Sequence, residues 1–150
     1  MPYDSLRKGR FSEAQRAYFV TTVLAERQSR YFADLYIARL VVAEMRALHQ
    51  SCVVNSFAWV VMPDHVHWLF QLGMDQDLST LIKGFKARSA RRVNEKLGQQ
   101  GALWQRAFHD HALRADEDVK AIARYIVANP LRAGLAKNIG DYPLWDAAWL

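Results

Sequence analysis

The chain has 150 residues, of which 51% are hydrophobic and 12% aromatic, a composition that fits one folded domain and excludes an intrinsically disordered protein. Its single cysteine excludes an intramolecular disulfide, and the lack of any run of about 18 apolar residues excludes a membrane-spanning helix. The formal net charge of +5 is compatible with a polyanionic partner, so we expect a soluble, cytoplasmic protein that could bind nucleic acid.

The first third of the chain predicts an arm, a strand and a helix. Residues 1–16 are polar and basic and are expected to form an N-terminal arm. The segment Tyr18–Leu24 is rich in β-branched and aromatic residues, as strands are. From Phe32 to His49 the apolar residues recur in a broad helical stripe, which predicts a helix.

Two further strands follow, joined by a tight turn. They are predicted over Val53–Met62 and His65–Leu72. Between them Pro63 fixes its own φ angle and Asp64 tolerates a corner, which is the chemistry of a tight turn. The two strands are therefore expected to form a hairpin.

The second half of the chain alternates again between helix and strand. Leu78–Leu97 has a helical pattern, with Asp77 or Ser79 as its N-cap. The segment Trp104–Arg114 could supply a fourth strand.

A last helix is predicted from Asp116, as N-cap, to about Asn129, where the Asn-Pro sequence stops it. The order β-α-β-β-α-β-α predicts an α+β, ferredoxin-like fold: a split βαβ antiparallel sheet with one extra helix. No repeat or long linker divides the chain, so residues 1–150 are expected to form one domain.

The predicted third strand carries two histidines, His65 and His67, on one face, because side chains at i and i+2 of a strand point the same way. Val66 then faces the opposite layer. Two adjacent imidazoles beside a polar turn suit a metal ion. The alternative is that each histidine is only hydrogen-bonded at a strand end, and the residues alone leave both interpretations open.

A second pair with the same spacing is His109 and His111. Asp110 lies between them, so the opposite face of that segment carries a charge and not an apolar anchor. This favours an exposed edge or loop, and a metal site with Asp110 as an additional ligand is the other interpretation.

The predicted last helix places Tyr125 and Asn129 on one face, because they are four residues apart. Each has an ordinary structural role available. Asn129 could cap the helix ahead of Pro130, and Tyr125 could be an amphipathic core aromatic whose hydroxyl reaches solvent.

Two segments, taken together, resemble one protein family. Met62–Leu69 (MPDHVHWL) followed by Tyr125–Leu135 (YIVANPLRAGL) resembles the REP-associated tyrosine transposases, relatives of the single-tyrosine HUH transposases of bacterial insertion sequences. The family pattern is Met-Pro-Asn/Asp-His-hydrophobic-His-hydrophobic-Leu, then Tyr-x-x-x-Asn-Pro-x-Arg-Ala-Gly-Leu. Asp64 departs from the commoner Asn and adds a negative charge beside the expected metal site, where it could alter metal preference or merely serve the turn.

The resemblance implies strand-specific cleavage and rejoining of DNA, with the catalytic tyrosine on the last helix. Tyr125 would be the nucleophile, leaving a 5′-phosphotyrosine link and a free 3′-hydroxyl. His65, His67 and Asn129 would hold a divalent cation, Mg²⁺ or Mn²⁺, although imidazoles also accept zinc. A phenol with its ordinary pKa of about 10 is a modest nucleophile but a good leaving group on resealing. Because ligand histidines must be neutral, activity is expected to be lost as pH falls through about 6 to 6.5.

The implied partner is single-stranded DNA with a hairpin folded from a REP-like palindrome, so the protein is expected to associate with the nucleoid. Related transposases form swapped dimers, and a homodimer stays open here. Basic residues of the arm and of the second predicted helix are candidates for phosphate contacts, because that helix run lacks acidic residues at i,i+4 spacing before Glu95; a solvated helix face is the alternative. These candidates are Arg7, Lys8, Arg10, Lys83, Lys86, Arg88, Arg91 and Arg92.

Three aromatic residues, Tyr31, Trp104 and Phe108, could stack on unpaired bases, although a core role is available to each. Two rival classes of function also stay open. One is a non-catalytic module that binds single strands on a ferredoxin-like sheet. The other is a metal-dependent phosphodiesterase in which water attacks the phosphate. Both predict behaviour that does not depend on the Tyr125 phenol.

Overall fold

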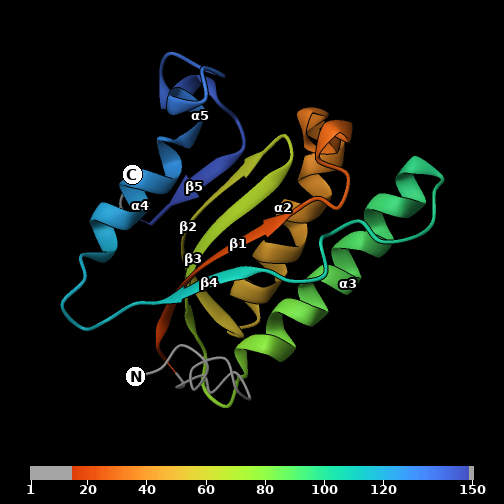
Figure 1. Cartoon of the computed structure of the whole chain (residues 1–150). Coiled ribbons are helices and arrows are strands. Elements are labelled where there is room, and N and C mark those ends of the chain that lie inside the picture. Colours follow the sequence, from red (N-terminus) through yellow and green to blue (C-terminus); the bar gives the residue numbers. More distant parts are fainter. Residues whose placement is uncertain (1–14, 149–150) are drawn as a thin grey trace.

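The computed structural model describes residues 15–148, which form a five-stranded antiparallel sheet with helices on both faces (Figure 1). The strands are β1 (Ala17–Val23), β2 (Val54–Met62), β3 (His65–Leu72), β4 (His109–Ala112) and β5 (Trp145–Ala147). Their order in the sheet is β4-β1-β3-β2-β5. Because β3 lies between β1 and β2 and runs antiparallel to both, the first two strands are the parallel arms of a split βαβ unit, as predicted.

The three longer α-helices begin where an aspartate side chain caps them. Asp34 accepts a hydrogen bond from the Tyr36 N–H, and Asp77 from the Thr80 N–H, so Asp77 is the N-cap of the second predicted helix. Asp118 accepts from the Ala121 N–H, so the prediction that Asp116 caps the last long helix is wrong by two residues. The helices are α2 (Leu35–Gln50), α3 (Leu78–Leu97), α4 (Val119–Val127) and α5 (Asn129–Arg132), with 3-10 turns η2 (Arg27–Ser29), η3 (Tyr31–Ala33) and η4 (Ile139–Asp141).

The structure differs from the sequence prediction mainly at the two edges of the sheet. The fourth strand covers only His109–Ala112 of the predicted Trp104–Arg114. Trp104 joins the sheet through one isolated bridge to Leu24, and its buried indole N–H donates to Ser89 Oγ. The strand β5 was not predicted, because three residues are too few to show an alternation.

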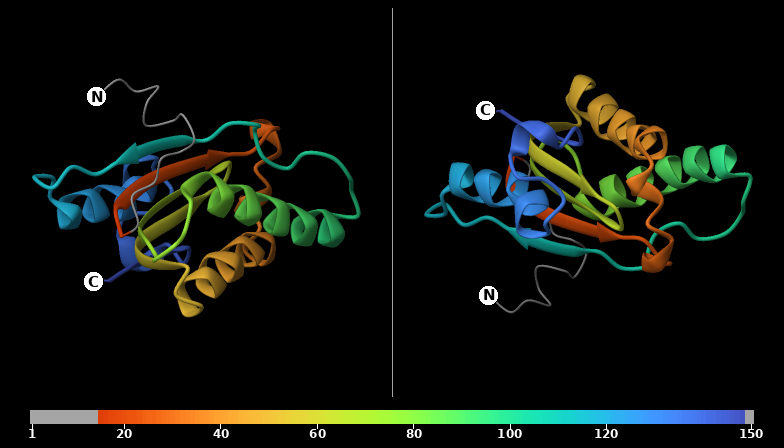
Figure 2. Two further views of the ribbon diagram at one scale, coloured as in Figure 1. Left: turned by 90° about the horizontal axis from the view of Figure 1, so that it is seen from below. Right: turned by 90° about the horizontal axis from the view of Figure 1, so that it is seen from above.

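The two faces of the sheet have different coverings, α2 and α3 on one and α4 on the other (Figure 2). Alternate residues of β3 follow this division. Trp68 and Phe70 are buried with the α2 and α3 side chains, whereas Leu69 packs with Ile126 of α4. The odd-numbered face of β3 is therefore the face that α4 shares.

The start of the described chain is tied to the sheet. The Gln15 N–H donates to the Leu72 carbonyl, and the Leu72 N–H donates to the Arg16 carbonyl. The rest of the predicted arm lies outside the described residues, including the candidate DNA contacts Arg7, Lys8 and Arg10. Within residues 15–148, no helix has the length and apolar character needed to span a membrane.

Candidate active site on one face of the sheet

The strand β3 holds His65 and His67 side by side on the face that α4 shares. Their ring centroids are 4.7 Å apart. In the sheet register His67 lies opposite Thr21 of β1 and Val60 of β2, so hydrogen-bonded strands flank it on both sides. The alternation of a central strand therefore places the two imidazoles next to each other.

Each imidazole has a polar partner at its Nδ1 atom. The Asp64 carboxylate oxygen Oδ1 lies 2.6 Å from His65 Nδ1, and the Thr21 hydroxyl lies 2.8 Å from His67 Nδ1. Within residues 15–148, neither Nε2 atom has a hydrogen-bond partner. A metal-binding histidine commonly donates its other ring N–H to a carboxylate or similar group, which leaves the second nitrogen for the ion. The donor set therefore fits a cation held by the two Nε2 atoms.

The protonation of His67 also fits coordination. Burial, the neighbouring His65 and the charge of Arg132 lower the pKa of His67 from 6.5 to about 4. Because only neutral imidazole binds a metal ion, His67 is ready to coordinate well below neutral pH. The threshold of 6 to 6.5 expected for an ordinary histidine does not apply to this residue.

Tyr125 lies on α4 and is 56% exposed. The Arg132 guanidinium carbon lies 3.9 Å from the centroid of the Tyr125 ring, and Arg132 Nη2 donates to the Tyr125 carbonyl at 2.7 Å. Arg132 also acts electrostatically on His67. One arginine thus contacts the tyrosine and places its charge within reach of the histidine pair, which brings the two sequence motifs to the same side of the sheet.

The third predicted ligand, Asn129, is half-buried at the start of α5. Its carbonyl accepts a hydrogen bond from the Ala133 N–H at 3.0 Å. In the described part of the chain, no hydrogen bond or ring contact joins Asn129 or Tyr125 directly to either imidazole. The structure places both residues at the α4–α5 junction, and their roles stay predictions.

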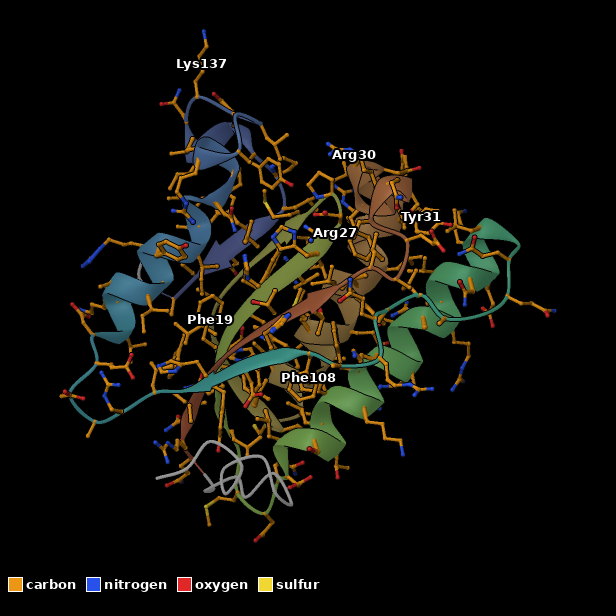
Figure 3. The ribbon with its side chains drawn as sticks, viewed as in Figure 1. Phe19, Arg27, Arg30, Tyr31, Phe108 and Lys137 are labelled. Carbon is orange, nitrogen blue, oxygen red and sulfur yellow. The ribbon has the colours of Figure 1, made fainter. Side chains whose placement is uncertain are left out.

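Asp64 joins His65 to Arg27, a residue that lies outside both sequence motifs. Arg27 Nε donates to Asp64 Oδ2 at 2.9 Å. Burial alone would raise the pKa of Asp64, but hydrogen bonds from His65 and Arg27 outweigh it and lower that pKa. Figure 3 shows Arg27 and Arg30 at the end of the sheet where the β2–β3 turn lies. Arg27 gave no signal in the sequence, because its contact depends on how β1 and β3 are aligned.

The second histidine pair lies on the edge strand β4, so the prediction of an exposed edge is confirmed. Both His109 and His111 are exposed. His111 Nε2 lies 2.9 Å and 3.0 Å from the two carboxylate oxygens of Glu117. Nowhere in residues 15–148 do three His, Cys, Asp or Glu side chains gather in a way that could hold a metal ion.

The basic side chains of α3 mostly contact the protein itself. Arg88 and Arg92 form ion pairs with Glu44 of α2, at 3.1 Å and 3.2 Å, and Glu44 is only 8% exposed. Lys86 Nζ donates to backbone carbonyls of the 105–107 loop at 2.7 to 3.3 Å, and burial lowers its pKa. Lys83 and Arg91 are exposed and have no ion pair within the described residues.

The position of α3 also bears on the predicted phosphate contacts. The helix covers the face of the sheet opposite the histidine pair (Figures 1 and 2). DNA that contacted both would have to pass around an edge of the sheet. The phosphate contacts stay a prediction, and the acidic partner that the α3 sequence lacks comes from α2.

The three aromatic candidates for base stacking have contacts of their own. Trp104 is a core residue that is 5% exposed. The Tyr31 hydroxyl donates to Gln99 Oε1 at 3.0 Å. Lys86 Nζ lies 5.7 Å from the centroid of the Phe108 ring. Stacking on bases is untested for all three.

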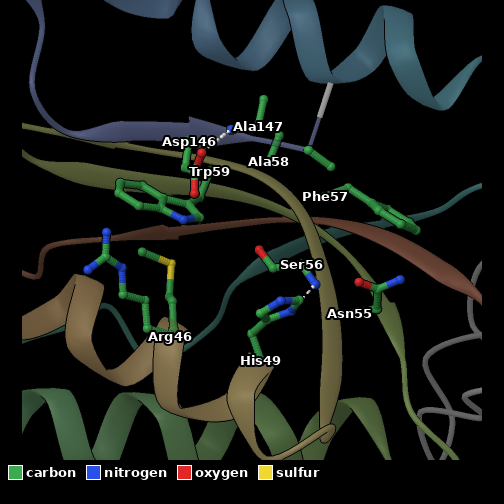
Figure 4. A pocket seen from close by; sticks show the side chains of 11 residues that line it. Arg46, His49, Asn55, Ser56, Phe57, Ala58, Trp59, Asp146 and Ala147 are labelled. Carbon is green, nitrogen blue, oxygen red and sulfur yellow. Dashed lines mark hydrogen bonds between the residues drawn. The ribbon is translucent and has the colours of Figure 1, made fainter. Parts of the chain in front are cut away.

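A cavity of about 250 Å³ lies elsewhere, between the end of α2 and the strands β2 and β5 (Figure 4). His49, Ser56 and Trp59 line it, and the Ser56 N–H donates to His49 Nδ1 at 3.0 Å. None of the predicted site residues that lie between residues 15 and 148 lines this cavity. The histidine pair therefore lies outside this cavity, on the other side of β2.

Comparison with known proteins gives consistent matches. The family model for IS200-like transposases matches residues 16–129. A REP-associated tyrosine transposase of Escherichia coli K12 is 32% identical over 128 residues, which cover 84% of this chain and 73% of that protein. A solved REP-associated tyrosine transposase bound to a REP hairpin matches with a TM-score of 0.74 and 26% identity, over 91% of this chain and 79% of that one.

A more distant likeness concerns the fold alone. A bacterial tRNA(His) guanylyltransferase-like protein in complex with ATP matches with a TM-score of 0.54 and 14% identity, over 86% of this chain and 61% of that one. The shared sheet says nothing about a shared reaction, because one fold hosts many functions.

Proposed function

We propose a function that follows from the family of this chain, which belongs to the IS200-like transposases and, among them, to the REP-associated tyrosine transposases. The chain cleaves and rejoins single-stranded DNA through a covalent bond to Tyr125. The phenolic oxygen attacks a backbone phosphorus, and the bond from phosphorus to the 3′-oxygen breaks. The phenolic proton passes to solvent, and the 3′-oxygen leaves as a hydroxyl. The reverse reaction reseals the strand.

The observation that carries this proposal is the arrangement of the histidine pair. His65 and His67 stand 4.7 Å apart with both Nδ1 atoms engaged, and the exposed Tyr125 is linked to their side of the sheet through Arg132. A passive single-strand binder has no need of paired imidazoles whose Nε2 atoms, in the described part of the chain, have no hydrogen-bond partner. The geometry therefore supports an enzyme over a binding module.

The divalent cation is proposed to be Mn²⁺ or Mg²⁺, held by His65, His67 and the amide oxygen of Asn129. These three ligands are uncharged, so the ion keeps its full charge for neutralising the phosphate oxygens when bound. Two imidazoles favour Mn²⁺ over Mg²⁺, which prefers oxygen ligands. The protein's own part is to present both imidazoles side by side on one face of the sheet and to keep Tyr125 exposed to the strand.

The substrate is proposed to be a single strand beside a hairpin. The support is that the solved relative is bound to a REP hairpin, and that this chain has a net charge of +5. The exposed Arg27 contacts Asp64, the neighbour of His65, and the exposed Arg132 acts electrostatically on His67; both are proposed to contact phosphates on either side of the bond that is cut.

The test is covalent-adduct formation on end-labelled single-stranded hairpin DNA with Mn²⁺ or Mg²⁺. We expect a slowly migrating adduct on a denaturing gel that disappears with Tyr125→Phe and with EDTA. Tyr36→Phe is the matched control, because Tyr36 is a 72% exposed tyrosine on α2 and should leave the adduct unchanged. Cleavage that survives Tyr125→Phe without an adduct would identify a water-using phosphodiesterase. Binding without cleavage would identify a passive module.

The same assay decides whether Tyr125 acts together with the histidine pair of its own chain or with that of a partner chain in a dimer. Tyr125→Phe and the double variant His65→Gln, His67→Gln are each expected to be inactive. The contact of Arg132 with Tyr125, together with its effect on His67, supports a tyrosine that acts within one chain. Mixing the two inactive variants should then give no adduct, whereas a dimer that exchanges tyrosines would recover activity.

A further inference from the structure

We propose that Asp64 and Arg27 are positioning residues for His65. In this arrangement the Asp64 carboxylate holds the ring proton on Nδ1, so that the lone pair of Nε2 is directed at the cation, and Arg27 holds the carboxylate in place. The inference rests on the proposed function for the role of the cation. The arrangement of the three side chains stands independently of it.

The hydrogen-bond geometry determines which ring nitrogen carries the proton. A carboxylate accepts hydrogen bonds and donates none, so the 2.6 Å contact between Asp64 Oδ1 and His65 Nδ1 requires the proton on Nδ1. The other carboxylate oxygen, Oδ2, accepts from Arg27 Nε at 2.9 Å. The two oxygens of Asp64 are thus divided between one imidazole and one guanidinium, and this fixes the plane of the carboxylate.

The backbone holds Asp64 in the position that this geometry needs. The Leu24 N–H donates to the Asp64 carbonyl at 2.9 Å, and the Phe32 N–H donates to the Pro63 carbonyl at 3.1 Å. Two backbone hydrogen bonds therefore hold the chain segment that follows β1 against the β2–β3 turn. The same segment carries Arg27, at the end of the sheet seen in Figure 3.

The neighbouring ligand is held differently. His67 Nδ1 faces the Thr21 hydroxyl, which can either donate or accept, so this contact allows both tautomers. Of these two histidines, only His65 has its tautomer fixed by a charged group. Changes at Asp64 should therefore act on His65 and leave the hydrogen bond of His67 intact.

Substitutions at Asp64 and Arg27 give a graded series of variants. Asp64→Asn keeps an oxygen that can accept from Nδ1–H but loses the charge that pairs with Arg27. Asp64→Ala loses the acceptor altogether. Arg27→Met keeps the carboxylate but removes the donor that orients it.

The first experiment is nitrogen-15 NMR of the histidine side chains in the metal-free protein at pH 7.5. We expect His65 to carry its proton on Nδ1 in the wild type and in Asp64→Asn, and to become a mixture of tautomers in Asp64→Ala. Unchanged tautomers in Asp64→Ala would overturn the inference. Because no metal or DNA is present, this result is independent of whether the protein cleaves DNA.

The second experiment measures Mn²⁺ binding by electron paramagnetic resonance, with no DNA present. Loss of a residue that orients a metal ligand costs about 10- to 100-fold in affinity, and we expect that loss for Asp64→Ala, with smaller losses for Asp64→Asn and Arg27→Met. The matched control is Glu117→Gln, which removes the carboxylate–histidine contact of β4 and should leave affinity within about twofold of wild type, the spread allowed for a distant change. Equal affinities of wild type and Asp64→Ala would refute the role of Asp64.

The two experiments together distinguish a failure of this inference from a failure of the proposed function. A wild type that binds no Mn²⁺ would contradict the proposed function, while the NMR comparison would still decide whether Asp64 fixes the tautomer. The Asp64→Asn variant controls for misfolding of the turn, because asparagine fits the same turn position and the variant should fold normally. A normal NMR spectrum of that variant with weakened Mn²⁺ binding would support the inference without any contribution from unfolding.

Discussion

Two histidine pairs with the same spacing lie on the same face of this sheet, His65 and His67 on β3 and His109 and His111 on β4. The register shows this, because Thr21 of β1 lies opposite both His67 and His109. The pairs are therefore separated by a single strand. They differ in their neighbours, since β3 is hydrogen-bonded on both sides and β4 is an edge.

This difference shows that the spacing of the histidines places each pair on one face, whereas the side chains around each pair determine which ring nitrogens are engaged. On β3, Asp64 and Thr21 engage the Nδ1 atoms, and within residues 15–148 the Nε2 atoms have no hydrogen-bond partner. On β4, Glu117 engages Nε2 of His111, and both rings are exposed. The two pairs therefore differ in which ring nitrogen is engaged, Nδ1 of His65 and His67 on β3 and Nε2 of His111 on β4.

The largest expected effect comes from substituting each pair in turn. His65→Gln or His67→Gln should slow adduct formation on hairpin DNA by about 100-fold or more, because losing a cation ligand removes several kcal/mol of charge stabilisation. His109→Gln and His111→Gln should stay within about twofold of wild type, as distant surface changes do. The measurement is single-turnover adduct formation at saturating Mn²⁺. A comparable loss of adduct-formation rate in the β4 variants would contradict the inferred difference between the two pairs.

A second expected effect concerns stability in acid. His67 has its pKa lowered from 6.5 to about 4 in the folded protein, so the unfolded chain binds more protons between these values. The free energy of unfolding should therefore fall as pH decreases from 6.5 towards 4, by about 3 kcal/mol in total from this residue. Above pH 6.5 this residue should contribute no slope.

Urea unfolding of the metal-free protein at pH 7.5 and pH 4.5 measures this effect. The wild type should lose more stability between the two pH values than His67→Gln, and the difference isolates the contribution of His67 from that of other groups. His111→Gln, which removes a histidine from the edge strand, should retain the decline caused by His67. Equal declines in the wild type and His67→Gln would contradict the assignment of a buried, neutral His67.

The sequence predicted those parts of the fold and site that depend on local pattern. The helix α3 and the strand β3 have the bounds that periodicity predicts, and the alternation of β3 correctly places His65 and His67 on one face. A local pattern does not reveal which residues a strand or helix meets in space. The contact of Arg27 with Asp64 depends on strand register, and the pairing of Arg88 with Glu44 depends on two helices lying side by side.

The smallest expected effect concerns Arg132, which contacts Tyr125, the proposed nucleophile, and acts electrostatically on His67. Arg132 stacks on the Tyr125 ring and donates to the Tyr125 carbonyl. An exposed cation–π contact and one hydrogen bond are together worth about 1 to 2 kcal/mol, so Arg132→Gln should slow adduct formation about 5- to 30-fold. Arg132→Lys keeps the charge but not the planar fork, and should recover part of the rate.

The readout that distinguishes positioning from simple DNA attraction is the comparison of the adduct-formation rate with hairpin affinity. If Arg132 positions Tyr125, the rate at saturating DNA falls and the dissociation constant for the hairpin changes little. If Arg132 acts mainly as a phosphate contact, the dissociation constant rises and its salt dependence weakens by about one unit of slope, while the saturated rate is preserved. The first result would tie the tyrosine to the β3 pair through a single side chain. The second would leave the histidines and the tyrosine to be aligned by the DNA strand that both contact.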